Sequence, residues 1–116
     1  MSTIYHITHL DAWEEAQRKG FYEGNTLFTE GFIHCSTAAQ VVPVADRFYL
    51  GQRGLVLIEI NPARLHAELR YEESEPGQLF PHIYGPLNIE AVSAVFAFRP
   101  NAEGRFNLPT GVVVFA

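Results

Sequence analysis

Three histidines lie in short motifs of polar and aromatic residues. They are His6 in YHIT, His34 in FIHCST and His82 in PHIYGP. An imidazole titrates near neutral pH, carries a donor and an acceptor on one ring, and can bind metals. A single histidine on a strand is as often a hydrogen-bonded structural residue, so residue type alone assigns no role. Position favours function, because His6 and His34 each lie in a predicted strand that leads directly into a helix start.

A junction between a strand and a helix can bind anionic or ribosyl groups. The first turn of a helix presents free N–H groups and the positive end of the helix dipole. At the second junction, Ser36 and Thr37 add hydroxyl groups, although capping the helix is an alternative role for both. At the first junction, alternation along the strand places Thr8 on the same face as His6. The aromatic rings of Tyr5 and Tyr84 lie in the same motifs and are candidates for stacking on a ligand.

The sequence predicts no metal site and no cysteine nucleophile. Histidines and a cysteine are legitimate zinc ligands. The chain nevertheless lacks H-x-x-x-H and C-x-x-C spacing, and on a strand His34 and Cys35 point to opposite faces. Cys35 follows Phe32 and Ile33, a context typical of a small core residue. Serine-nucleophile and glycine-rich phosphate-loop motifs are also absent.

Glutamates are the usual partners of a histidine that transfers protons. Glu59 lies within the apolar run LVLIEI, where a carboxylate is either at the sheet surface or buried for a function, and we expect the surface position. Glu72, Glu73 and Glu75 form an acidic run that we interpret as a solvated turn.

Two strand–helix units are predicted near the N-terminus. Residues 4–8 are rich in β-formers, and Thr8 with Asp11 has the spacing of a capping box for a helix that ends at Gly20. Residues 32–35 form a second predicted strand, and Thr37 with Gln40 completes a box for a second helix. Pro43 predicts either a kink in this helix or a main helix that begins at the proline.

The remainder of the chain is predicted to be mostly β. Residues 55–60 are nearly all apolar and predict a strand covered on both faces, whereas residues 65–72 alternate and predict a strand with one wet face. We expect a loop over 74–81, a rigid connector at 84–86, a strand over 92–98 and an irregular segment up to an apolar C-terminal tail at 110–116. The predicted fold class is α+β, with two helices near the N-terminus packed on a largely antiparallel sheet.

Length and charge limit the classes of function. A chain of 116 residues predicts a single domain over 1–116 with one core. The net charge of −5 and the scattered arginines make nucleic acid and anionic membrane unlikely partners. A single cysteine suits a reducing compartment, and no apolar run reaches the ~18 residues of a membrane span. We therefore expect a cytoplasmic domain.

The three histidine motifs resemble the family called domain of unknown function 952. IYHIT, GFIHCST and PHIYGPLNIEAV occur in the order of that family, and the resemblance covers about residues 4–109. The family in turn is similar to the ADP-ribosyltransferase fold, whose members bind NAD. The resemblance thus implies a nucleotide-binding cleft and, where catalysis occurs, ADP-ribosyl or glycosyl transfer to a small-molecule or protein acceptor.

The resemblance also implies roles for single residues. His6 resembles the histidine that holds the ribose of NAD, and Tyr5, Thr8, Ser36 and Thr37 would contact the cofactor with it. His34, His82 and Tyr84 would line the reacting end, although no carboxylate occurs in the PHIYG motif, where that superfamily often has a glutamate. Two alternatives remain open: a non-catalytic module that binds a small metabolite, and a structural domain that dimerises through the apolar tail.

Overall fold

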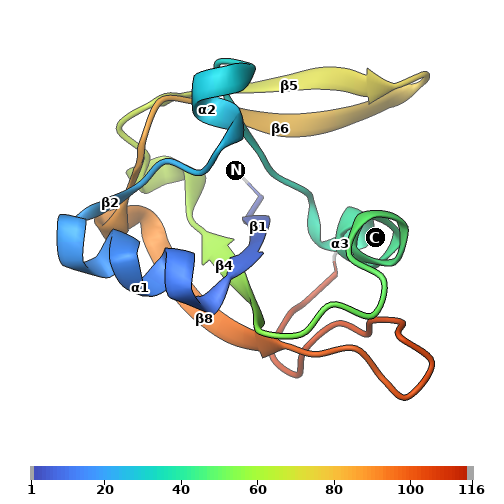
Figure 1. Cartoon of the computed structure of the whole chain (residues 1–116). Helices are drawn as coiled ribbons and strands as arrows, with labels where there is room; N and C mark the ends of the chain where they lie inside the picture. Colours follow the sequence, from blue (N-terminus) through green and yellow to red (C-terminus); the bar gives the residue numbers. More distant parts are fainter. Residues whose placement is uncertain (1, 115–116) are drawn as a thin grey trace.

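The chain folds around three small antiparallel sheets instead of the single sheet that was predicted (Figure 1). The structure is a computed structural model that describes residues 2–114. Within those residues it has three helices, one more than predicted, because the four-residue helix α2 gave no sequence signal; the helices are α1 (Leu10–Lys19), α2 (Thr26–Thr29) and α3 (Ala38–Phe48). The α+β class is confirmed.

The first sheet carries the core on both of its faces. Its strands are β1 (Ile4–His9), β4 (Leu55–Ile60) and β8 (Val92–Phe98), in the order β1-β4-β8. The central strand β4 packs Ile58 into one apolar cluster with Trp13 and Leu57 into a second cluster with Val41. The prediction that residues 55–60 are covered on both faces is therefore confirmed, since Ile58 on one face and Leu57 on the other are both fully buried.

The second sheet consists of β3 (Ile33–His34), β6 (Gln78–Tyr84) and β5 (Glu68–Glu75). A third pair joins β2 (Phe21–Tyr22) to β7 (Leu87–Asn88), and short 3-10 turns occupy Pro62–Arg64 and Ile89–Ala91. A single bridge connects the first and second sheets: the N–H of Tyr5 donates to Ser36 O, and the N–H of Ser36 donates to Tyr5 O, both at 2.8 Å.

α1 ends at Gly20 as predicted, but its predicted N-terminal cap is absent. α1 is preceded by His9, whose side chain makes no capping bond, so the predicted box of Thr8 with Asp11 is wrong. The Thr8 hydroxyl instead lies 3.0 Å from the hydroxyl of Tyr22. At the other end, Gly20 adopts φ +92° and its N–H donates to Ala16 O, as predicted.

α3 is one helix over Ala38–Phe48 with Pro43 inside it, so the main helix does not begin at the proline. The N–H of Thr37 donates to Gln40 Oε1 at 3.0 Å, which anchors the first turn. Proline has no N–H to donate to the carbonyl of Ala39, one turn earlier, so this helix loses one internal bond. Both residues lie on the exposed side of α3, where water or a ligand can reach the freed carbonyl.

Residues 74–81 are a hairpin, not the predicted loop. β5 continues to Glu75, Pro76 and Gly77 form the turn, and β6 begins at Gln78. Pro81 lies in the central strand β6, and its carbonyl accepts from the N–H of Cys35 on the β3 side, where the chain is already leaving the sheet. The N–H that proline lacks would point to this same side, beyond the last β3–β6 pair of His34 with His82, so the missing donor falls where the ladder ends.

The C-terminal segment is only partly described. Residues 110–114 form no strand or helix: Val112 packs against the second core cluster, and Val113 and Val114 are exposed. The remainder of the predicted tail, residues 115–116, lies outside the described residues. Over residues 2–114, none of the helices has the length and apolar character needed to cross a membrane.

The turn at Gly77 gives a stability prediction. Gly77 has φ +77°, and a Cβ at this position would meet no atom within 4 Å, so Gly77→Ala tests backbone strain without a steric clash. We expect Gly77→Ala to lower the free energy of unfolding by about 1 kcal/mol and Gly77→Asn to lower it by less, because asparagine tolerates this conformation better. Urea unfolding measures the free energy of unfolding of both variants. Equal urea midpoints for wild type and Gly77→Ala would contradict the left-handed conformation at Gly77.

Candidate functional site

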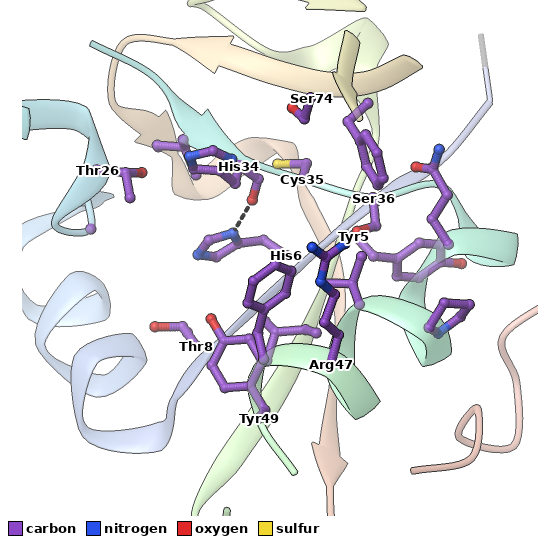
Figure 2. A pocket seen from close by; sticks show the side chains of 18 of the residues that line it. Tyr5, His6, Thr8, Thr26, His34, Cys35, Ser36, Arg47, Tyr49 and Ser74 are labelled. Carbon is purple, nitrogen blue, oxygen red and sulfur yellow. Dashed lines mark hydrogen bonds between the residues drawn. The ribbon is translucent and has the colours of Figure 1, made fainter. Parts of the chain in front are cut away.

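A cleft of about 840 Å³ runs along the free edge of β1, between α3 and the β3–β6–β5 sheet (Figure 2). One wall is β1 from Tyr5 to His9, and the opposite walls come from the start of α3 and from β3. The tip of the β5–β6 hairpin closes one end. Five of the predicted site residues line this cleft: Tyr5, His6, Thr8, His34 and Ser36.

The edge of β1 exposes backbone groups to this cleft. The N–H of Leu10 donates to Gly54 O, beside β4, whereas the N–H and C=O of Tyr5 bond Ser36 on the opposite side. Backbone groups alternate along a strand, so the N–H and C=O of Ile7 point the same way as those of Tyr5. Among the described residues, no backbone group pairs with Ile7 on that side. The cleft wall therefore carries the N–H and the C=O of Ile7 at fixed positions.

His6 is fixed by hydrogen bonds on both ring nitrogens. Nδ1 lies 2.6 Å from His34 O, and Nε2 lies 2.8 Å from the hydroxyl of Tyr22. A carbonyl can only accept, so Nδ1 carries the proton and, in the neutral ring, Nε2 accepts from Tyr22. The Tyr22 oxygen can in turn accept from the hydroxyl of Thr8, 3.0 Å away.

Burial keeps His6 neutral. Desolvation lowers the pKa of His6 to about 4, against a smaller opposite effect of the bond to the His34 carbonyl. Burial also raises the pKa of Tyr22. At neutral pH, His6 is therefore an uncharged part of the cleft wall, and the hydrogen-bonded chain Thr8–Tyr22–His6–His34 holds that wall in place.

Tyr5 contributes its ring to the cleft while its hydroxyl is held elsewhere. That hydroxyl donates to Glu59 Oε2 at 3.1 Å, and Ser93 donates to Glu59 Oε1 at 2.8 Å. Burial, followed by the charge of Glu59, raises the pKa of Tyr5 to about 12. Glu59 is thus a half-buried carboxylate at the sheet surface with hydroxyl partners, and it lies outside the cleft.

The α3 wall supplies the cation of the cleft. Arg47 of α3 forms an ion pair with Glu75 of β5, and both residues line the cleft. Gln40 ties α3 to the next strand of the hairpin, β6, because its Nε2 donates to Leu79 O at 2.8 Å. Thr37, predicted to contact a cofactor, does not line the cleft and marks the start of α3.

His82 and Tyr84 line a different, smaller cavity of about 430 Å³. His34 and His82 are paired across β3 and β6, with ring centroids 5.3 Å apart. His34 lines both cavities, so the three histidines do not meet around one hollow as the sequence interpretation required. The physical reason is that His82 projects from the face of the second sheet, whereas His6 belongs to the edge of the first.

The smaller cavity contains polar partners that sequence reasoning missed. His82 Nδ1 lies 2.9 Å from Glu72 Oε1, and its Nε2 lies 3.0 Å from Ser74 Oγ. The hydroxyl of Tyr84 donates to the same Glu72 oxygen at 2.5 Å. Bonds from Tyr84 and then from His82 lower the pKa of Glu72. The interpretation of residues 72–75 as a solvated turn is thus wrong, because these residues continue strand β5. The alternating pattern of residues 65–72 was the sequence signal for this strand.

The described residues offer no arrangement that suits a metal ion or a reactive thiol. Over residues 2–114, no three His, Cys, Asp or Glu side chains converge on a point where a metal ion would fit. Cys35 is buried in the first core cluster, and burial raises the pKa of its thiol, as expected of a core residue.

The neutral state of His6 gives a pH prediction. Because its folded pKa lies below the ordinary value of 6.5, the unfolded chain binds more protons between pH 6.5 and 4, and this part of the stability is lost as pH falls through that window. We expect His6→Gln to flatten the pH dependence of unfolding there by up to about 1.4 kcal/mol per pH unit. Urea unfolding at pH 7, 6 and 5 measures it, with His9→Gln, an exposed histidine of the same strand, as control. Parallel curves for wild type and His6→Gln would contradict a neutral buried His6.

Comparisons with known proteins give a family and no activity. Residues 7–95 match a family described as "Protein of unknown function (DUF952)". The crystal structure of protein CC0527 from Caulobacter crescentus has 32% identity and a TM-score of 0.85, over 91% of this chain and 94% of that chain. The solution NMR structure of CC0527 gives 33% identity and a TM-score of 0.79, over 90% and 91%. No curated protein matches the chain.

These findings support one of the two resemblances seen in the sequence. They do not support the similarity to the ADP-ribosyltransferase fold. Because the family model spans most of the chain and CC0527 is similar over almost its full length, the chain belongs to the DUF952 family of proteins of unknown function.

Proposed function

We propose that the main cleft binds NAD or a related nucleotide. The observation that carries this proposal is the open edge of β1, which places the N–H and C=O of Ile7 in the wall of a cleft of about 840 Å³. Cavities of roughly 300–1,000 Å³ enclose ligands of this size. A planar carboxamide, such as that of nicotinamide, has one acceptor and one donor side and matches the paired groups of Ile7.

The side chains around this edge suit the other parts of a nucleotide. The hydroxyl-bearing Ser36 lies beside the edge, where ribose hydroxyls need partners. Arg47 can bind phosphate oxygens through charge-assisted hydrogen bonds when it leaves Glu75. The exposed ring of Phe48, at the end of α3, offers a surface on which a base can stack.

Binding without turnover is the second candidate, and the separation of the two cavities favours it. His82 and Tyr84, which would act at the reacting end, line the smaller cavity. Glu75 is the one carboxylate among the described residues that line the main cleft, and it is already paired with Arg47. Neutral His6 has no free ring nitrogen with which to accept a proton.

A titration tests the proposed ligand. NAD and ADP-ribose are added to ¹⁵N-labelled protein, and we expect saturable shifts of the amide signals of His6, Ile7 and His34. Loss of one charge-assisted phosphate contact costs about 1.5–3 kcal/mol, so Arg47→Gln should raise Kd by roughly ten-fold or more. The control is Arg18→Gln, an arginine paired with a glutamate on the exposed side of α1. Absence of shifts at millimolar ligand would overturn the proposal.

A second assay separates the enzyme from the binding module. The protein is incubated with NAD, and release of nicotinamide is followed by chromatography. We expect NAD binding without measurable release. Release that the His34→Ala variant abolishes would instead show a transferase, because His34 is the histidine that borders both cavities.

A further inference from the structure

Ser74, His82 and Glu72 form a continuous chain of hydrogen bonds in the smaller cavity. Ser74 Oγ lies 3.0 Å from His82 Nε2, and His82 Nδ1 lies 2.9 Å from Glu72 Oε1. The ionised carboxylate can only accept, so Nδ1 carries the ring proton and the lone pair of Nε2 faces the serine hydroxyl. This is the arrangement in which a histidine can take the proton of a serine as the serine attacks.

The chain of bonds is held rigidly on the side away from the serine. His82 is 3% exposed, and the ring of Phe32 stacks on it with centroids 4.1 Å apart. Tyr84 donates to Glu72 Oε1 at 2.5 Å, which fixes the carboxylate and leaves it ionised. With both nitrogens engaged, His82 can reach a ligand only through Ser74, which lies on the exposed side of the hairpin.

A β-bulge brings these residues to one face. The register shifts between Glu73 and Glu75, so Ser74 is the additional residue of β5 and Arg70 lies opposite His82. Bulges re-aim side chains and are common beside active sites. Without the bulge, Tyr71 would stand opposite His82, and Glu72 would project from the other face of the sheet.

We propose that Ser74 is a nucleophile for acyl transfer, with His82 as its general base and Glu72 as the residue that orients the base. The Ser74 oxygen forms a bond to the carbonyl carbon of an ester while its proton moves to His82 Nε2. The intermediate then expels the alcohol, which takes that proton from Nε2 and leaves an acyl-serine. Water attacks the acyl-serine by the same route, which releases the acid and restores the serine.

The charge of the cavity limits the substrate class. Three carboxylates line it, from Glu30, Glu72 and Glu73, and no lysine or arginine does among the described residues. An anionic substrate would be repelled there. The substrate class is therefore a small neutral or cationic ester. This activity does not require the proposed nucleotide: His82 and Glu72 line the smaller cavity and not the main cleft, although Ser74 lines both.

Covalent labelling tests the nucleophile. The full chain is incubated with a fluorophosphonate, from which the serine oxygen displaces fluoride, and intact mass with peptide mapping locates the adduct. We expect one adduct, on Ser74, that is absent in Ser74→Ala and forms at least ~100-fold more slowly in Glu72→Gln. Ser93→Ala is the matched control, since Ser93 also bonds a glutamate but has no histidine partner in the described structure. No adduct on Ser74, or equal rates in wild type and Glu72→Gln, would overturn the proposal.

A second variant tests whether His82 and Glu72 activate position 74 even if the fluorophosphonate reacts poorly. Ser74→Cys preserves the shape of the hairpin, and its introduced thiol should react with iodoacetamide at pH 7 at least ~10-fold faster than in the double variant with Glu72→Gln. The native Cys35 is buried and gives no background. Equal alkylation rates in the two variants would show that the dyad does not activate position 74 and would overturn the proposal independently.

Discussion

The cleft depends on how little of β1 the second sheet covers. Cys35 still donates to Pro81 in the second sheet, and the next residue, Ser36, exchanges two backbone hydrogen bonds with Tyr5 in the first. The chain then turns directly into α3 at Ala38. One residue is therefore all that bridges the sheets, and the edge of β1 beyond Tyr5 stays open at Ile7. Because Tyr5 and Ser36 pair in the antiparallel sense, the residue in register with Ile7 is His34, which instead belongs to β3 and pairs with His82 of β6, so the ladder along β1 stops and the cleft stays open.

Polar side chains along this cleft are hydrogen-bonded to other protein groups before any ligand arrives. Among the described residues, no buried side-chain nitrogen or oxygen lacks a hydrogen-bond partner. His6 is held by the His34 carbonyl and Tyr22, and Tyr5 is held by Glu59 on the far side of its ring. Because these side chains are already oriented, a ligand would not have to order them, which reduces the entropic cost of binding.

Periodic segments of the sequence predicted their structure, and the hairpin shows why the rest could not be predicted. Residues 4–8, 55–60 and 92–98 form strands as expected, because apolar burial fixes which side chains face inward. The predicted loop over 74–81 is a hairpin, and its strand β6 tolerates Pro81 because the N–H that proline lacks would point to the side where the pairing with β3 ends. The bulge at Ser74 leaves no trace in residue types, yet it decides which face carries Glu72. The histidines could be identified from their sequence motifs. Their hydrogen-bond partners could not, because these depend on the strand register.

His6 and His82 differ in chemistry because their hydrogen-bond partners differ. His6 bonds a carbonyl and a hydroxyl, and burial without a counter-charge keeps it neutral and unable to take up a proton. His82 is more deeply buried and has a carboxylate, Glu72, as its partner on Nδ1 and the Ser74 hydroxyl on Nε2. The proposed proton transfer therefore uses the histidine of the hairpin cavity and not that of the cleft along β1. The same fold therefore places a surface suited to binding next to a cluster suited to chemistry, with His34 and Ser74 bordering both cavities.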